Sequence, residues 1–183
     1  MQRPGIFGIV NVTRDSFSDG GRFLTPDAAC AHAEQLRLAG ADVLDLGAES
    51  THPDSEDVAA DEELRRFFDD RRAAFEAAGI EPARVVFDPG MGFFLGREAG
   101  PSLTVLKHLA SLAASHGPLL VSVSRKSFLG EVTGRPVAQR GAATLAAELA
   151  AARRGVGFLR THDVAALSDA LAVEAAVEGA AGA

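Results

Sequence analysis

Five short apolar runs punctuate the chain, and each is nearly continuous in its hydrophobic residues. Strands with one solvated face alternate apolar and polar residues, whereas parallel strands buried on both faces are apolar throughout. The five runs lie at residues 6–12, 43–47, 85–87, 119–123 and 158–160. The pattern therefore predicts five parallel β-strands.

Helix-forming stretches separate these runs. Thr25 is the predicted N-cap of the first helix, Pro26 takes its first position, and Gly40 ends it. The expected helices lie at residues 26–39, 60–78, 102–115, 138–154 and 164–177. Because strands and helices alternate, the strands should be joined by right-handed crossovers. We therefore predict a single α/β domain over residues 1–183.

Charge and composition limit the classes of partner that this protein is expected to bind. The 183 residues carry a net charge of -7 without a cluster of Lys or Arg, which argues against nucleic acid as a ligand. No apolar run approaches the roughly 20 residues that span a bilayer, and no signal peptide is recognisable. The only cysteine, Cys30, cannot form an internal disulfide, as suits a reducing compartment. We expect a cytoplasmic protein that contacts no membrane.

Polar residues gather where the predicted strands end. Those at or near carboxyl ends are Asn11, Asp45, Asp88, Ser124, Arg125, Lys126, Arg160 and His162. In parallel α/β folds that edge of the sheet carries the ligand site. We therefore expect these side chains to form one functional site.

The first two segments each allow two interpretations. Asn11 opens a long loop rich in Asp and Ser, whose oxygen atoms suit Mg²⁺ and its phosphate ligands, although such residues also fill ordinary loops. Asp45 lies inside an apolar strand, where a carboxylate is costly unless it is hydrogen-bonded. It could bind a ligand or bond to neighbouring loop backbone.

Three further segments suggest how a ligand is held. Asp88 precedes a glycine-rich turn with Phe93, and could accept N–H groups of a flat heterocycle or cap the turn. Arg125 and Lys126 could bind an anion or a ligand carbonyl, or could be a solvated surface pair. Arg160 and His162 alternate along a strand, so both can face an anion such as a diphosphate.

The order and spacing of these segments resemble dihydropteroate synthase over nearly the whole chain. The shared stretches read Asn-Val-Thr-x-Asp-Ser-Phe-Ser-Asp-Gly-Gly, Asp-Leu-Gly-x-Glu-Ser-Thr, Asp-Pro-Gly-x-Gly-Phe, Ser-Arg-Lys-Ser and Arg-Thr-His. The stretches at residues 88–96 and 141–149 resemble the sulfonamide-insensitive versions of that enzyme most. The resemblance thus implies folate biosynthesis, with a possible part in sulfonamide resistance.

The resemblance also implies a reaction and residue roles. The family joins p-aminobenzoate to a dihydropterin diphosphate and releases pyrophosphate with the help of Mg²⁺. By that likeness Asn11 would bind the metal, and Asp88 and Lys126 would hold the pterin. The remaining assignments are Arg160 and His162 for the diphosphate, Asp45 and Thr51 for the diphosphate and pterin end, Phe93 and Ser124 near p-aminobenzoate, and Arg125 for substrate binding.

One departure from the family is large. A full barrel typically needs about 250 residues, and about three central βα units are absent here, with the junction inside the helix at 60–78. We therefore expect an incomplete, TIM-barrel-derived (β/α) barrel of about five parallel strands with outer helices. The strand order could keep the family neighbours, as third, fourth, fifth, first and second. Alternatively, the second run could pair with the third and scatter the site.

The missing units also bear on activity. An uncovered apolar face and open strand edges favour self-association, so we expect a homo-oligomer. The chain could be an active transferase. It could equally be an inactive remnant that still binds pterin or phosphate.

Overall fold

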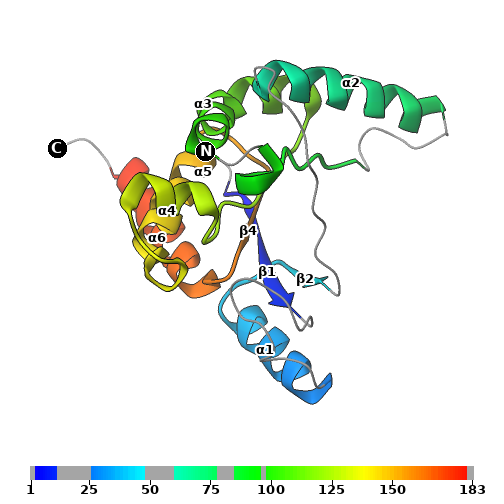
Figure 1. The fold of residues 1–183 in the computed structure, drawn as a ribbon. Helices are drawn as coiled ribbons and strands as arrows, with labels where there is room; N and C mark the ends of the chain where they lie inside the picture. The colour runs from blue at the N-terminus through cyan, green and yellow to red at the C-terminus, as the bar shows by residue number, and fades with distance from the viewer. Residues whose placement is uncertain (1–2, 12–25, 48–59, 78–84, 96–97, 181–183) are drawn as a thin grey trace.

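A computed structural model describes residues 3–11, 26–47, 60–77, 85–95 and 98–180. The strands are β1 (Gly5–Asn11), β2 (Val43–Gly47), β3 (Leu120–Val121) and β4 (Phe158–Thr161). The α-helices are α1 (Pro26–Leu38), α2 (Ala60–Ala77), α3 (Ala99–His116), α4 (Ser127–Thr133), α5 (Gly141–Ala152) and α6 (Val164–Glu178). Short 3-10 turns lie at η2 (Gly92–Leu95) and η3 (Val137–Gln139). Strands and helices follow the predicted order, except that no described strand separates α2 from α3 and that both α4 and α5 lie between β3 and β4 (Figure 1).

The sheet is parallel and has the order β2-β1-β4-β3. The predicted strand at 85–87 contributes a single parallel bridge, from Phe87 to Leu119, beside β3. Pairing stops there because Asp88 turns back onto Gly90 and Pro89 has no N–H to donate. The sheet therefore has four strands rather than five. Its order is nevertheless the predicted one that keeps third, fourth, fifth, first and second runs together.

Pairing of β1 with β4 joins the first and the last strand that the structure describes. Ile6 stands opposite Leu159 and Gly8 opposite Thr161. A Cβ atom on Gly5 would lie 2.8 Å from the Phe158 ring, and one on Gly8 would lie 3.1 Å from Leu36 of α1. These two glycines let β4 on one side and α1 on the other approach the β1 backbone closely.

Helix α2 is fixed to the Phe87 end of the sheet. The buried ring of Phe68 stacks on Phe87 with 4.5 Å between ring centroids, and it forms an edge-to-face pair with His116 of α3 with 5.4 Å between centroids. Nε2 of His116 is 3.1 Å from Oδ1 of Asp69. The chain therefore runs from β2, at one outer position of the sheet, to the other outer position, where α2 lies against α3 (Figure 1).

Two helix predictions differ from the structure. The predicted helix at 138–154 is η3 followed by α5, which starts only at Gly141. Helix α4 was not predicted, because Gly130 and the β-branched Val132 and Thr133 weaken the helical signal of its seven residues. No described helix is long and apolar enough to cross a membrane.

We predict that packing of α2 against the sheet depends on the side chain of Phe68. Replacing a buried phenylalanine by alanine removes its packing and leaves a cavity, so Phe68→Ala should lower the free energy of unfolding by about 3–5 kcal/mol. The neighbouring Phe67 is 48% exposed, and Phe67→Ala should cost about 1 kcal/mol or less. Urea denaturation measures both values. Equal losses in the two variants would contradict the placement of α2.

Candidate functional site

The carboxyl ends of the strands meet at one edge of the sheet. Asn11, the last residue of β1, stands opposite Gly47, the last residue of β2. The same edge carries the segment after β3, with Ser124 and Lys126, and the segment after β4, with His162. The fold therefore brings together the strand ends that the sequence marked as polar.

Ser124 ties the segment after β3 to the end of β4. Its side chain is 5% exposed, and its Oγ accepts the backbone N–H of His162 at 3.3 Å. Nδ1 of the His162 ring lies 2.8 Å from the same Oγ. Ser124 thus fixes the direction of the His162 imidazole.

Arg160 lies in β4, and His162 directly follows that strand. The residues between and before them, Thr161 and Leu159, are fully buried on the opposite side of β4. Because side chains alternate along a strand, Arg160 and His162 lie on the half-exposed side. Alternation therefore favours a guanidinium and an imidazole on one side of the sheet at the end of β4.

The turn after Phe87 packs on Lys126. Asp88 accepts the N–H of Gly90 at 2.9 Å, so its carboxylate does cap the turn. At Gly92, where φ is +69°, a Cβ atom would lie 3.2 Å from Ser127 Oγ and 3.4 Å from Lys126 Cδ. Glycine at this position therefore admits both the left-handed backbone and the close approach of the lysine stem.

Lys126 is electrostatically coupled to both Asp88 and Arg160. Burial lowers the pKa of its ammonium group, the positive charge of Arg160 lowers that pKa further, and the Asp88 carboxylate opposes the shift. One carboxylate and two cations thus act on each other at this edge. Such an arrangement can accept N–H groups of a heterocycle through Asp88 and bind an anion beside Arg160.

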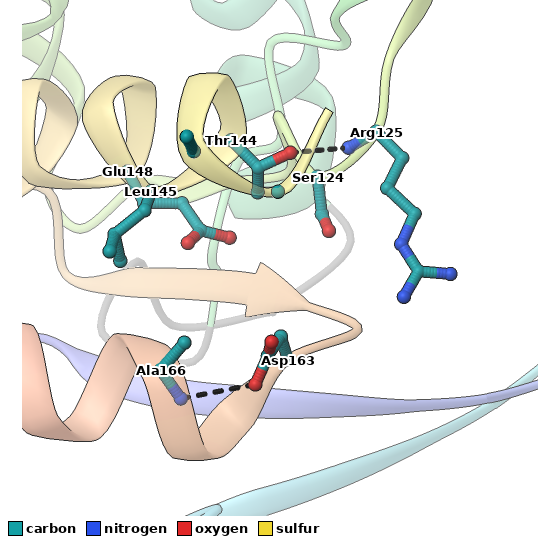
Figure 2. A pocket seen from close by; sticks show the side chains of 9 residues that line it. Ser124, Arg125, Thr144, Leu145, Glu148, Asp163 and Ala166 are labelled. Carbon is teal, nitrogen blue, oxygen red and sulfur yellow. Dashed lines mark hydrogen bonds between the residues drawn. The ribbon is translucent and has the colours of Figure 1, made fainter. Parts of the chain in front are cut away.

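A buried acidic residue, to which the sequence pattern assigned no role, lies close to the segment after β3. Glu148 of α5 is 2% exposed, and burial raises the pKa of its carboxyl group to about 7, against the effect of its hydrogen bond with Thr161. It borders a pocket of about 240 Å³ together with Ser124, Arg125, Thr144 and Asp163 (Figure 2). A lone charged residue in the alanine-rich stretch 141–152 was the available signal.

Other predicted site residues are only partly described. Thr51 lies outside the described residues. For Asn11, Asp45 and Phe93 the structure describes the backbone but not the side chain. Within the described ranges, no group of three or more His, Cys, Asp or Glu side chains could hold a metal ion.

Known proteins with similar sequences are dihydropteroate synthases. A family model described as "Pterin binding enzyme" matches residues 7–69 and 61–162. Dihydropteroate synthase type-2 of Escherichia coli is 38% identical over 94% of this chain and 96% of the relative. The dihydropteroate synthase of Neisseria meningitidis serogroup C is 34% identical over 93% and 92%.

Solved structures agree with the sequence relatives. Dihydropteroate synthase from Xanthomonas albilineans in complex with 7,8-dihydropteroate matches with a TM-score of 0.87 and 32% identity, over 98% of this chain and 95% of that chain. The Yersinia pestis enzyme with a sulfonamide drug complex matches with a TM-score of 0.88 and 26% identity, over 97% and 95%. The likeness extends to a parallel α/β fold of the TIM-barrel type.

The comparisons also locate the shortening. The two segments that match the family model overlap within α2, where the sequence placed the junction. The alignment with the type-2 enzyme extends over 259 residues, more than the 183 of this chain. The relative therefore has residues with no counterpart here.

We predict that Glu148 makes stability depend on pH. Its folded-state pKa of about 7 lies above the ordinary value of 4.5, so the folded protein binds this proton more tightly than the unfolded chain. The stability from that proton is complete below about pH 4.5 and is lost as the pH rises through about 7. Glu148→Gln, which keeps an acceptor for Thr161, should therefore be more stable than wild type at about pH 8 by roughly 2 kcal/mol.

Urea denaturation at about pH 5 and pH 8 checks this prediction. The advantage of the variant should shrink at the lower pH, because the wild-type carboxyl is then protonated. Glu131→Gln, on the exposed side of α4, is the control and should change little at either pH. A gain that is the same at both pH values would contradict a raised pKa for Glu148.

Proposed function

Because the chain belongs to the pterin-binding enzyme family, and its relatives are dihydropteroate synthases, we propose that it condenses p-aminobenzoate with a dihydropterin diphosphate and releases pyrophosphate. The observation that carries this proposal is the electrostatic interaction of Lys126 with Asp88 and Arg160, which come from the segment after β3, the turn after Phe87 and β4. These groups come from segments far apart in the sequence. The same segments bear the likeness to the family.

The charges suit the bond changes of such a transfer. The aryl amine nitrogen of p-aminobenzoate attacks the methylene carbon attached to the pterin ring. The carbon–oxygen bond to the diphosphate breaks, the pyrophosphate keeps the electron pair, and the amine loses a proton. Arg160 and His162 would hold the negative charge that develops on the leaving group, because they lie together at the end of β4.

Asp88 and Lys126 would bind the pterin ring. The turn uses Oδ1 of Asp88 as an acceptor, and a carboxylate can accept several N–H groups at once. Lys126, half-buried against the turn at Gly92, would donate to ring acceptors from the opposite direction. Phe93 and Ser124 would bind near p-aminobenzoate, Asp45 and Thr51 would line the diphosphate and pterin end, and Arg125 would contribute to substrate binding.

We also propose that Mg²⁺ assists the departure of the diphosphate. The position of Asn11 at the carboxyl end of β1 supports this proposal, because an amide oxygen suits a cation that prefers oxygen ligands. A single amide would leave most positions around the ion to phosphate oxygens and water, as is usual for Mg²⁺. The ion would neutralise developing charge on the diphosphate.

A second function is favoured by the shortening. The 259-residue alignment implies that a wall present in the relatives is missing from this chain. The chain could then bind a pterin or a phosphate without completing the transfer. Both functions require Lys126 and Arg160 for ligand binding, so binding alone cannot distinguish them. Only turnover can.

We further propose that the protein works in the cytoplasm and tolerates sulfonamides. The first proposal follows from a single cysteine, which suits a reducing compartment. The second follows from the stretches at residues 88–96 and 141–149, which resemble sulfonamide-insensitive versions of the enzyme.

Pyrophosphate release tests the function. Purified protein given dihydropterin diphosphate, p-aminobenzoate and Mg²⁺ should release pyrophosphate only when all three are present. Lys126→Ala should lower the rate by about 100-fold or more, as is typical when a charged group at the reacting centre is removed. Lys107, the other lysine of the sequence, lies on α3, and Lys107→Ala should keep the wild-type rate. Folded wild-type protein that binds pterin but releases no pyrophosphate would contradict the transferase and support the binding function.

We also predict that the protein self-associates through the outer positions of its sheet. Val43 of β2 and Val86 beside Phe87 are 40% and 43% exposed, although β2 and Phe87 belong to the sheet. Exposed apolar residues next to open strand edges favour pairing with a second copy.

Light scattering should therefore give a mass larger than that of one chain, and Val86→Asp should reduce it. Val132→Asp, at a 59% exposed position of α4, is the control and should leave the mass unchanged. A monomer at every concentration tested would contradict this prediction.

A further inference from the structure

Arg125 has a backbone conformation that non-glycine residues rarely adopt. Its φ of 59° makes it the one described residue other than glycine with a positive φ. Such a conformation is unfavourable for an L-residue and persists only where surrounding groups fix it. Arg125 stands between Ser124 and Lys126, so its conformation sets the directions of two site residues.

Helix α5 binds the backbone on both sides of Arg125. Thr144 Oγ1, in the first turn of α5, accepts the Arg125 N–H at 3.0 Å (Figure 2). Nη1 of Arg140, the residue preceding α5, donates to the Arg125 carbonyl at 3.0 Å and to the Lys126 carbonyl at 3.3 Å. The two peptide groups that define this left-handed turn therefore both depend on α5.

Gly130 makes room for the guanidinium of Arg140. A Cβ atom at Gly130 would lie 2.2 Å from Arg140 Nη2, so any side chain there would displace this group. Nε of Arg140 donates to the carbonyl of Arg135 at 3.0 Å and orients the guanidinium from the other side. A planar group with several fixed donors can bind three carbonyls in this way, whereas a lysine ammonium could not match their directions.

We propose that Arg140 and Thr144 are positioning residues that hold Arg125 in its left-handed turn and thereby direct Ser124 toward His162 and Lys126 toward Asp88 and Arg160. Arg125, Gly130, Arg140 and Thr144 together form what we call the Arg125 clamp. The inference deepens the proposed function, on which it rests for its catalytic consequence. It adds Arg140 and Thr144 as residues that affect the reaction through the positions of Ser124 and Lys126.

Three variants release the clamp by different means. Arg140→Lys keeps the charge but loses the planar donors. Gly130→Ala displaces the guanidinium without changing any charge, and the displaced atoms are the far end of a flexible side chain, so the fold should survive. Thr144→Val removes the hydroxyl acceptor, and Thr144→Ser, which restores it, should recover the wild-type behaviour.

Gly100→Ala is the matched control for Gly130→Ala. Gly100 also lies in a helix, α3, and a Cβ atom there would meet nothing within 4 Å. Circular dichroism and thermal denaturation would confirm that each variant is folded before it is compared.

The titration of Lys126 measures the clamp directly. Isotope-labelled lysine gives two side-chain signals in wild type, from Lys107 and Lys126, and a Lys126→Arg variant assigns them. The Arg140→Lys variant has a third lysine signal, which is identified by its absence from wild type. In wild type, burial should hold the pKa of Lys126 below the ordinary value of about 10.4. Each releasing variant should move this pKa toward the ordinary value, whereas Gly100→Ala and Thr144→Ser should leave it in place. Folded Gly130→Ala and Arg140→Lys proteins with an unchanged Lys126 titration would overturn the inference.

Turnover supplies the second measurement. The releasing variants should lower kcat by about tenfold or more with a smaller change in KM for p-aminobenzoate, as expected when reacting groups are misplaced. Wild-type kcat in all three folded variants would also overturn the inference. Absence of turnover in wild type would count against the transferase alone, because the Lys126 titration of ligand-free protein still decides whether the clamp exists.

Discussion

The pairing of β1 with β4 is the constraint on which the rest of the structure depends. It joins the first strand of the chain to the last, and it places β2 on one side and β3 on the other. Because all these strands are parallel, Asn11, Ser124 and His162 reach the same edge of the sheet from distant parts of the sequence. A chain with fewer units than its relatives can thereby keep the family's neighbours together, with α2 joining the two outer positions.

Contacts between the loops then turn this edge into a site. Ser124 joins the loop after β3 to His162, Gly92 lets the Asp88 turn pack on Lys126, and α5 fixes the backbone of Arg125. Each contact links two loops, so the position of one charged group depends on its neighbours. Burial strengthens the electrostatic interactions within such a group and makes each missing partner costly.

Much of this was predictable from sequence because it depends on local patterns. The apolar runs located β1, β2 and β4, and the junction fell within α2 as expected. The single bridge at Phe87 and the start of α5 at Gly141 were missed, because they depend on turns formed by Asp88 and Arg140. The role of Arg140 was also missed, since its three carbonyl partners are backbone groups that no side-chain pattern reveals.

The central claim is that these separate segments form one ligand site in the shortened chain. Nuclear magnetic resonance titration of the intact protein with dihydropterin diphosphate, read at backbone amides, tests it most directly. The account predicts that amides of Asn11, Gly90, Lys126 and His162 shift together and saturate at one common ligand concentration. Shifts confined to a single loop, or different saturation points for the Asp88 turn and the end of β4, would contradict it.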